Sequence, residues 1–292
     1  MITASIVTYD HHFLDIEPVL RSLFASPVDI IYIIDHSEHM LRLEDELNQF
    51  RDRVFTGEPQ LQQRVAEGMQ LIYLRHHNNG YGGGNNVALR EAQRLGAKYH
   101  LVVNPDIWFG PRVIPALTAY MDSHPDVAQM MPKVLYPNGS VQRLARLLPT
   151  PFDLFSRFCL PRFLFAHRNE VNELVPSHFD KVLNVPFLSG CFMFLRTDAV
   201  KEINGFDERF FLYAEDMDFS RRMNQRYKTL FYPKVPVYHT FTRGSRKNLK
   251  LSLTHIISSI KYFNKWGWWH DAERTRINKQ LKADMTGPGI TD

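Results

Sequence analysis

The sequence predicts an α/β fold with a mostly parallel central sheet and helices on both of its faces. Two observations lead to this prediction. In the first half of the chain, short and nearly continuous apolar runs alternate with helical stretches, and polar residues follow the end of each run. Strands that helices cover on both faces are typically unbroken Ile/Val runs, and strand–helix alternation is the pattern of parallel sheets.

The elements of the first half follow one another in a regular order. The expected strands cover residues 5–8, 30–34, 70–74 and 99–103. The expected helices cover residues 16–24, 40–50, 85–95 and 112–122. A Gly-rich turn leads into the helix at 85–95, where the free N–H groups of a helix N-terminus would favour an anion.

The second half is less regular. Residues 147–165 are aromatic and broken by proline, with no clean period. Beyond them we expect mixed strand over 182–196, a helix over 214–227, short strands at 230–232 and 235–239, a helix over 249–266 and then a polar helix. We expect a domain boundary near residue 245, which gives a main domain over 1–245 and a C-terminal helical extension over 246–292.

Composition excludes several classes of protein. The chain has 292 residues, a formal net charge of +4 and 44% hydrophobic residues, which is ordinary for a globular protein and excludes a disordered tail or a coiled coil. The longest apolar run, 30–34, is far shorter than the roughly 20 residues that span a bilayer. The N-terminus lacks the pattern of a cleaved signal. Cys159 and Cys191 have no metal-binding spacing, so we expect reduced, structural thiols in a cytoplasmic protein.

Polar residues follow four of the expected strands. They are Thr8-Tyr9-Asp10, Asp35-His36-Ser37, the segment 78–86 and Asn104-Pro105-Asp106. In open α/β sheets, ligands bind outside the carboxyl ends of the strands. The glycine run within 78–86 matches neither the dinucleotide fingerprint nor the P-loop, because Asn85 replaces the third Gly and no Lys follows. A tight turn that binds nothing is the alternative.

One acidic residue of the expected helix 214–227 lies on its apolar face. Asp216 shares that face with Phe219, Met223 and Tyr227, whereas Asp218 lies about 160° away because each residue turns about 100°. A carboxylate that points inward is costly unless it is paired or functional, and burial would raise its pKa toward that of a useful base. The alternative is that the acids of this segment only complement the helix dipole. His239, at the end of the last strand, is a metal-ligand candidate only if Asp106 holds a metal.

Taken in order, these motifs resemble the family 2 inverting glycosyltransferases of the GT-A fold, in particular bacterial rhamnosyltransferases and galactofuranosyltransferases. The resemblance covers about residues 3–245. The matching segments are Ser5–Tyr9, Asp35–Ser37, Asn79–Asn86, Asn104–Asp106, Leu188–Met193, Gly205–Phe211, Glu215–Phe219 and His239.

The resemblance implies a role for each matching position. Asp216 would be the catalytic base, and Asp106 and His239 would bind Mn²⁺ or Mg²⁺. The donor-binding set would be Thr8, Tyr9, Asp35, Ser37, Asn79, Gly80, Gly83, Gly84, Asn85, Asn104 and Asp106. Two positions depart from the family: Asn104 replaces the first Asp of the metal motif, and His36 stands where Asn is usual.

The resemblance also implies a reaction. A sugar would pass from a nucleotide-diphosphate donor, dTDP-rhamnose or a UDP-sugar, to a hydroxyl of a glycan or lipid-linked acceptor in cell-surface polysaccharide synthesis. Two rival hypotheses remain. A nucleotidyltransferase would share a similar sheet, but its Gly-rich basic signature is missing after Thr8. A nucleic-acid-binding protein would account for the basic C-terminus, although we expect no nucleic-acid partner. An oligomer is left open.

The expected helix 249–266 has an apolar stripe with lysines outside it and tryptophans at its end. The stripe is Leu249, Leu253, Ile256, Ile257, Ile260 and Phe263; the lysines are Lys250, Lys261 and Lys265; the tryptophans are Trp266, Trp268 and Trp269. A helix in a membrane interface has this pattern. The resemblance implies that such a contact would lie at the cytoplasmic face of the inner membrane, where lipid-linked acceptors are found. We favour the alternative, in which the stripe packs on the main domain.

Overall fold

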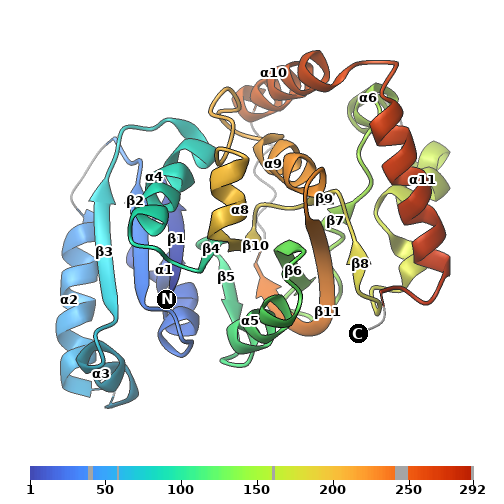
Figure 1. Ribbon diagram of the computed structural model, residues 1–292. Helices are drawn as coiled ribbons and strands as arrows, with labels where there is room; N and C mark the ends of the chain where they lie inside the picture. The colour runs from blue at the N-terminus through green and yellow to red at the C-terminus, as the bar shows by residue number, and fades with distance from the viewer. Residues whose placement is uncertain (39–41, 58, 160–161, 241–248, 291–292) are drawn as a thin grey trace.

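The computed structural model describes residues 1–38, 42–57, 59–159, 162–240 and 249–290 (Figure 1). Its main sheet has the strand order β3-β2-β1-β4-β10-β6-β11-β5, with β8 paired to β11. Helices surround this sheet, which confirms the predicted α/β class. The first four strands in this order are parallel, whereas β10 runs antiparallel to both β4 and β6. The sheet is therefore parallel at its N-terminal side and mixed beyond it.

The first half contains the predicted elements and one further helix, α3. The strands are β1 (Ile2–Thr8), β2 (Ile30–Asp35), β3 (Gln70–Arg75) and β4 (Tyr99–Val103). The helices are α1 (Phe13–Phe24), α2 (Arg42–Gly57), α3 (Pro59–Ala66), α4 (Gly80–Arg94) and α5 (Val113–Ser123). β2 is buried along its whole length, as its run of Ile residues requires.

Helix α4 begins five residues earlier than predicted. The glycines expected to form a flexible turn are instead its first turn, and they are buried. Gly80 has φ +84°, and a Cβ there would lie 1.9 Å from the carbonyl oxygen of Phe211. Glycine is required at this position because of both its backbone conformation and this close approach. The glycine run is thus the closely packed first turn of a helix. Glycine usually indicates a turn, so the local sequence did not predict a helix here.

The second half is built from shorter strands and helices. Its strands are β5 (Ile107–Phe109), β6 (Val127–Leu135), β7 (Ala145–Arg146), β8 (Leu183–Asn184), β9 (Phe187–Leu188), β10 (Phe192–Arg196) and β11 (Lys228–His239). Its helices up to residue 240 are α6 (Pro151–Cys159), α7 (Ala166–Asn172), α8 (Thr197–Glu202) and α9 (Glu215–Asn224), with short 3₁₀ turns at Arg162–Phe165 and Val175–Ser177. The two strands expected at 230–232 and 235–239 are one strand, β11, whose register shifts between Tyr232 and Pro236.

Two C-terminal helices, α10 (Leu249–Trp266) and α11 (Ala272–Thr286), complete the chain. Both share cores with earlier elements. Tyr262 and Phe263 of α10 lie in one cluster with Phe210 and Met217, and Leu281 of α11 belongs to the main core. The expected boundary near residue 245 lies outside the described residues, so the division into 1–245 and 246–292 stays a prediction.

Four central residues of the apolar stripe of α10 do not pack on the main domain, whereas Phe263 at its end does, so the favoured expectation was wrong for most of the stripe. Leu253, Ile256, Ile257 and Ile260 are 43–57% exposed, whereas Ser258, Ser259, Tyr262 and Phe263 are buried. Trp266 is half-buried, but Trp269 is 75% exposed. The side chains of Leu249 and Lys250 lie outside the described residues.

Two expectations from composition concern the thiols and the membrane. Cys191 is buried with a free thiol, while the side chain of Cys159 lies outside the described residues. Across the part of the chain that the structure describes, no helix has the length and hydropathy needed to span a bilayer.

Candidate functional site

The ends of β1 and β2 bring Thr8, Asp35 and Ser37 together. Thr8 lies opposite Asp35 in the parallel register, and its hydroxyl donates to Asp35 Oδ1 at 3.0 Å. The Ser37 backbone N–H and hydroxyl donate to the same oxygen at 3.1 and 2.6 Å. Tyr73, at the end of β3, donates its hydroxyl to Asp35 Oδ2 at 2.6 Å. Tyr73 is a residue of this cluster that the sequence analysis missed, since it lies within an apolar run.

Asp35 is therefore an ionised carboxylate held inside the protein. It is 1% exposed. Burial alone would raise its pKa, but the hydrogen bonds from Ser37, Tyr73 and Thr8 outweigh burial and hold the pKa of Asp35 below its usual value. Three of these hydrogen bonds converge on Oδ1 and one reaches Oδ2, so Oδ2 is the oxygen that keeps room for a further donor. Tyr9, by contrast, is 48% exposed at the same edge.

His36 packs against the start of α4. It is 3% exposed, and a Cβ on Gly84 would lie 2.7 Å from its Cε1. Burial first, and then the neighbouring His76, lowers the pKa of His36 to about 4, so the ring is neutral at pH 7. Its Nε2 atom finds no hydrogen-bond partner among the described residues. The departure from the family pattern at this position thus places a neutral ring where it packs tightly on Gly84.

The start of α4 offers fewer free N–H groups than expected. Gly80 N–H donates to Asn78 Oδ1 at 3.1 Å, and Tyr81 N–H donates to Phe211 O at 3.0 Å. A Cβ on Gly83 would lie 2.4 Å from the side chain of Asn79, whose buried Oδ1 has no partner among the described residues. Two of the first donors of the helix are thus already used inside the protein.

Asn85 was expected to contact the donor, but its side chain is committed elsewhere. It accepts from Ser5 Oγ at 2.7 Å and donates to Tyr81 O at 3.0 Å, and it is 1% exposed. Ser5 also contacts the buried ring of His100. This network fastens α4 to β1, so the structure places the Asn85 amide in the core rather than at the strand-end edge.

Asn86 has a similar internal role, which the sequence analysis did not assign. Its side chain donates to Phe206 O at 2.9 Å and accepts from Phe206 N–H at 2.8 Å. A Cβ on Gly205 would lie 2.6 Å from Asn86 Oδ1. The motifs Asn79–Asn86 and Gly205–Phe211 are therefore in direct contact, and this contact joins α4 to the segment that leads toward α9.

Asp106 and His239 meet at the other side of the sheet edge. His239 Nε2 lies 3.1 Å from Asp106 Oδ1, and β5 pairs with β11 at this point. Gln142 fixes the ring: its Oε1 lies 2.9 Å from His239 Nδ1, and its Nε2 donates to His239 O at 2.7 Å. No local signal in the sequence marks Gln142. Asn104, half-buried, donates its backbone N–H to Cys191 O at 2.9 Å.

This geometry suits a divalent cation. A backbone carbonyl can only accept, so the Gln142 amide is oriented with Oε1 toward Nδ1, which therefore carries a proton. Nε2 faces the Asp106 carboxylate at 3.1 Å, where either a second ring proton or a cation bound by both atoms satisfies the pair. An imidazole nitrogen and a carboxylate oxygen are suitable ligands for Mn²⁺. Among the described residues no group of three or more His, Cys, Asp or Glu is placed to hold a metal, so further ligands would come from substrate or water.

Asp216 lies at the start of α9 beside the β9–β10 turn. It accepts from Gly190 N–H at 2.9 Å and from its neighbour Met217 N–H at 2.8 Å. A Cβ on Gly190 would lie 3.2 Å from Asp216 Cβ, so glycine leaves room for the carboxylate. Tyr81 donates its hydroxyl to Gly190 O at 2.6 Å and thereby joins α4 to the same turn.

Three acids begin α9, and the expectation that only Asp216 points inward was wrong. Glu215 is 5% exposed and Asp218 is fully buried, whereas Asp216 is half-buried. Asp218 is paired with Arg222 and Lys265 at 2.7 Å each and accepts from Trp266 Nε1 at 2.8 Å. The helical wheel could not reveal this, because Asp218 is buried under α10, a helix about 30 residues further along the chain.

Glu215 and Asp216 are the under-satisfied carboxyl groups of the site. Burial, and next the charge of Asp216, raises the pKa of Glu215 well above its usual value. Its Oε2 has no hydrogen-bond partner among the described residues. Burial also raises the pKa of Asp216, although the hydrogen bonds from Gly190 and Met217 oppose it. The two groups titrate together, and we assign the negative charge to Asp216 because it has these two donors.

Helix α9 is held in place by a buried ion pair. Arg221 donates to both carboxylate oxygens of Asp271 at 2.8 Å, with side chains 1% and 3% exposed. Glu273 adds a contact at 3.0 Å, and Trp266 stacks on the guanidinium with its ring centroid 4.0 Å away. The C-terminal helices thus clamp the helix that carries Asp216.

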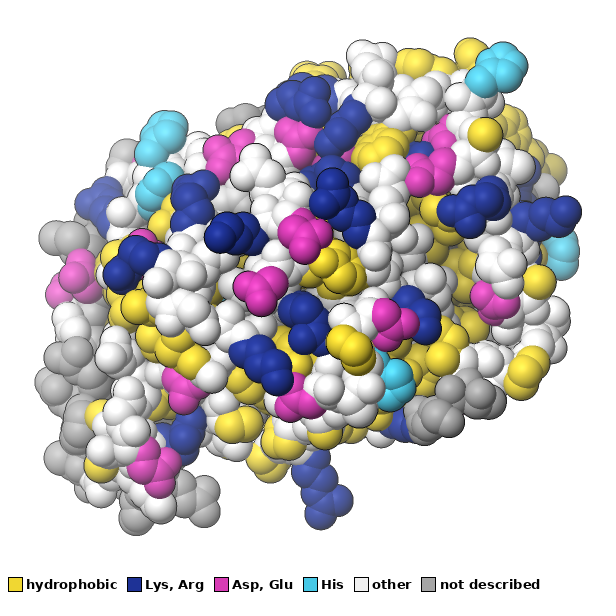
Figure 2. All heavy atoms as spheres, in the orientation of Figure 1, with side chains coloured by type: hydrophobic (Ala, Val, Ile, Leu, Met, Phe, Trp, Pro, Cys, Tyr) yellow, Lys and Arg dark blue, Asp and Glu magenta, His cyan; other side chains and the backbone are white. Residues whose placement is uncertain are grey.

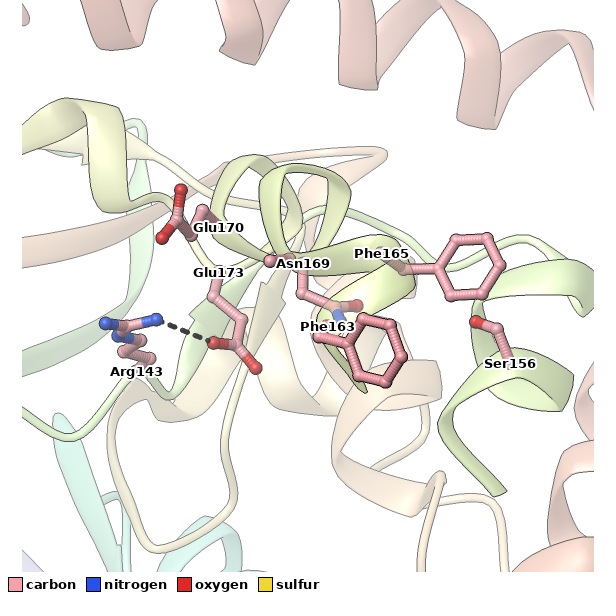
Figure 3. A pocket seen from close by; sticks show the side chains of 8 residues that line it. Arg143, Ser156, Phe163, Phe165, Asn169, Glu170 and Glu173 are labelled. Atoms are coloured by element: carbon pink, nitrogen blue, oxygen red, sulfur yellow. Dashed lines mark hydrogen bonds and ion pairs between the residues drawn. The ribbon is translucent and has the colours of Figure 1, made fainter. Parts of the chain in front are cut away.

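A cavity of about 250 Å³ lies apart from these residues, between α6, α7 and the loop before β7 (Figure 3). Phe163, Phe165 and the ion pair of Arg143 with Glu173, at 3.3 Å, line it. None of the predicted site residues does. The chemistry-bearing residues instead lie along the strand-end edge.

Comparison with known proteins gives consistent results. The model of a family described as glycosyltransferase-like family 2 matches residues 58–254. N-acetylglucosaminyl-diphospho-decaprenol L-rhamnosyltransferase of Mycobacterium tuberculosis is 28% identical over 222 residues, which cover 70% of each chain. Rhamnosyltransferase WbbL of Escherichia coli K12 is 26% identical over 201 residues, 66% of this chain and 73% of that one.

A solved structure shows the same fold. The mannosyltransferase PcManGT of Pyrobaculum calidifontis, in complex with GDP-Man and Mn²⁺, superposes with a TM-score of 0.60 at 13% identity, over 97% of this chain and 69% of that one. The central sheet and surrounding helices described above are thus those of the GT-A fold.

Proposed function

The chain belongs to glycosyltransferase family 2, and from this premise we propose that it transfers rhamnose from dTDP-rhamnose to a hydroxyl of a lipid-linked glycan acceptor. The named rhamnosyltransferase relatives support this donor, with a UDP-sugar as the alternative. Membership of the family favours sugar transfer over nucleotidyl transfer and over nucleic-acid binding.

One observation supports the reaction most directly: the turn at Gly190–Cys191 joins the two acidic centres. Gly190 N–H donates to Asp216, while Cys191 O accepts from the backbone N–H of Asn104, two residues before Asp106. After burial, the charges of Asp106 and Asp216 both help to raise the pKa of the Cys191 thiol to about 12, which indicates that both carboxylates lie near it. A metal-ligand candidate and a base candidate thus flank one turn.

In the proposed mechanism Asp216 is the general base. The acceptor hydroxyl gives its proton to a free lone pair of the Asp216 carboxylate as its oxygen attacks the anomeric carbon. The nucleotide diphosphate departs from the opposite face, so the configuration inverts. Because Glu215 is protonated, Asp216 carries the negative charge of the pair and is the group that accepts the proton. The raised pKa of Asp216 makes it a stronger base than an exposed Asp.

Asp106 and His239 would hold the metal, with Gln142 fixing the imidazole. A divalent cation bound there supplies positive charge that offsets the charge of the leaving diphosphate. Asn104 stands in place of a carboxylate and so removes one negative charge from the motif. We therefore expect weak affinity for the metal, roughly in the millimolar range, with the substrate phosphates supplying further ligands.

The nucleoside would lie at the ends of β1 and β2. Tyr9 is exposed there and offers a ring face, while Thr8, Asp35 and Ser37 form the floor beneath it. Asn79, Gly80, Gly83 and Gly84 would lie near the diphosphate and sugar. We propose Asn85 as a support for this floor through Ser5, in place of a direct donor contact.

We further propose that the protein is cytoplasmic and works at the inner-membrane face, where a lipid-linked acceptor presents its sugar. We propose that the division at residue 245 separates the part of the chain that binds the substrates from the C-terminal helices, and that it does not separate two independently folding units. The Asp271–Arg221 pair ties the later segment to α9, so we do not expect the first 245 residues to fold well alone.

The test is incubation of the protein with a panel of nucleotide-sugars, Mn²⁺ and lipid-extracted acceptors. Among the donors of the panel, we expect only dTDP-rhamnose to support sugar transfer and slow hydrolysis. Both activities should be lost in EDTA and should recover when Mn²⁺ is added. NMR of the anomeric proton should show a product inverted relative to the donor. Turnover of a UDP-sugar instead would replace the donor; retention of configuration, or full activity after chelation, would contradict the mechanism.

A further inference from the structure

Helix α10 presents an apolar face to solvent. We call Leu253, Ile256, Ile257 and Ile260 the α10 face; these residues follow the i, i+3, i+4, i+7 spacing of one helix side and are 43–57% exposed. Trp268 and Trp269 follow the helix at 37% and 75% exposure. Single exposed apolar residues are common, but six large ones at one end of a domain indicate a binding surface.

The other side of α10 is polar and fixes the orientation of the helix. Ser258 donates to Leu212 O at 2.8 Å, and Lys265 pairs with Asp207 at 2.8 Å and with the fully buried Asp218 at 2.7 Å. Tyr262 is fully buried and accepts from Arg221 at 3.2 Å. Rotation of α10 to bury its Leu and Ile side chains would break these contacts, so the outward face is the stable arrangement.

Charge identifies the chemistry of the partner. From Thr240 to His270 the sequence has six Lys and Arg residues and no Asp or Glu; the structure describes the side chains of Lys261 and Lys265 among them, and Lys265 is paired with Asp207 and Asp218. Lys261 is exposed beside the α10 face and donates to the backbone carbonyl of Arg209, whose 67% exposed side chain pairs with Asp207 at 2.6 Å. Figure 2 shows basic and hydrophobic side chains together along the upper edge, where Figure 1 places α10. An apolar helix side with basic flanks and terminal tryptophans complements an anionic bilayer surface.

The α10 face is mechanically linked to the candidate site. Lys261 donates to Arg209 O at 2.7 Å, and the Tyr213 ring stacks on His255 with centroids 4.6 Å apart. These contacts hold the segment that runs directly into Glu215 and Asp216. In Figure 1, α10 also lies at the edge toward which β3 points, which is the strand-end edge.

We propose that the α10 face, with Trp268 and Trp269, docks the protein on an anionic phospholipid bilayer. Docking holds the segment 207–214 and the start of α9 at the membrane surface. The docking itself stands on the exposed face and its charge; only its use, to meet a lipid-linked acceptor, rests on the proposed function.

The experiment is co-sedimentation of the full chain with vesicles of phosphatidylglycerol and phosphatidylcholine, and with phosphatidylcholine alone, at 50 and 500 mM salt. We expect binding to the anionic vesicles, weakening severalfold at high salt, with a blue shift of tryptophan emission on binding. The double variant Ile256→Ser/Ile257→Ser should lower partitioning at least tenfold. Leu14→Ser, which changes a 76% exposed apolar residue on α1, is the matched control and should bind as the parent does.

Two outcomes would overturn the docking proposal. One is equal partitioning of the double variant and the parent. The other is absence of vesicle binding together with a concentration-dependent dimer that the double variant abolishes, which would assign the face to a second copy. Hydrolysis of the donor in the absence of vesicles is measured in parallel. If hydrolysis persists while docking fails, the proposed function stands; if hydrolysis fails while docking persists, the proposed function falls alone.

Discussion

Two acidic regions of this molecule differ in how fully their carboxylates are satisfied. At the ends of β1 and β2, Asp35 is buried but accepts hydrogen bonds from Thr8, Ser37 and Tyr73, and its pKa is lowered. At the start of α9, Asp216 has only two backbone donors, Glu215 has an oxygen with no partner among the described residues, and both pKa values are raised.

The difference separates support from chemistry. A carboxylate that accepts four hydrogen bonds has a fixed charge and fixed geometry, which is what a floor for a ligand requires. A buried carboxylate with few donors retains lone pairs and a raised pKa, which is what proton transfer requires. Burial alone does not distinguish the two, since Asp35 is more deeply buried than Asp216.

The largest effect is expected from Asp216→Asn. The amide keeps the shape but cannot take a proton, so kcat should fall by about 10²–10⁴. The affinity for dTDP should change little and thermal unfolding only modestly, because Asn can still accept from Gly190 N–H while the hydrogen bond from Met217 N–H is lost. The check is steady-state kinetics beside calorimetric titration of dTDP with Mn²⁺; wild-type turnover would remove Asp216 from the chemistry.

The next effect concerns the clamp that holds α9. Arg221→Met leaves Asp271 buried without its cation, so the free energy of unfolding should fall by about 3–5 kcal/mol. Arg226→Met is the matched control: its pair with Glu202 is roughly half exposed on both sides, and its loss should cost about 0–1 kcal/mol. Urea unfolding of both variants measures the contrast. An equal loss of unfolding free energy in the two variants would show that the buried Arg221–Asp271 pair stabilises the protein no more than an exposed pair does.

A smaller effect is expected at the donor floor. Tyr73→Phe removes one donor from Asp35 and should cost about 1.5–3 kcal/mol of stability, the range for hydrogen bonds to charged groups. Because the pKa of Asp35 is lowered in the folded protein, its contribution is present above pH 4 and is lost as the pH falls through the folded value. The variant should therefore unfold in acid at a higher pH than the parent. An unchanged acid midpoint would contradict the support role of this hydrogen bond.

The N-terminal half, which holds the proposed donor site, could be predicted from the sequence because burial there follows the local pattern of apolar residues. The Ile-rich run at 30–34 and the segment 99–103, which ends in Leu-Val-Val, became inner strands, and the polar residues after them met at one edge, as parallel strands require. Asn85 and Asn86 lay in the right place, but their internal hydrogen bonds depend on Ser5 and Phe206, which are distant in the sequence.

The α9–α10 half could not be predicted in the same way. The wheel of α10 assigns Leu253 and Ile256 to the interior, but Ser258 and Tyr262 face inward, where Ser258 donates to Leu212 O and Tyr262 accepts from Arg221 of α9. The burial of Asp218 and the role of Gln142 likewise depend on contacts far along the chain. Hydrophobic periodicity carries no information about such partners.

The most direct test of the contrast is the pH dependence of kcat/KM for Glu215→Gln beside the parent. Glutamine reproduces the neutral form that the raised pKa of Glu215 predicts. In the parent, activity should fall as the pH drops, because protonation of Asp216 removes the base, and this limb should lie above the ordinary Asp range. We predict that Glu215→Gln keeps this limb and a kcat within a few-fold of the parent. A loss of activity as large as that of Asp216→Asn would make Glu215 the base and contradict the account.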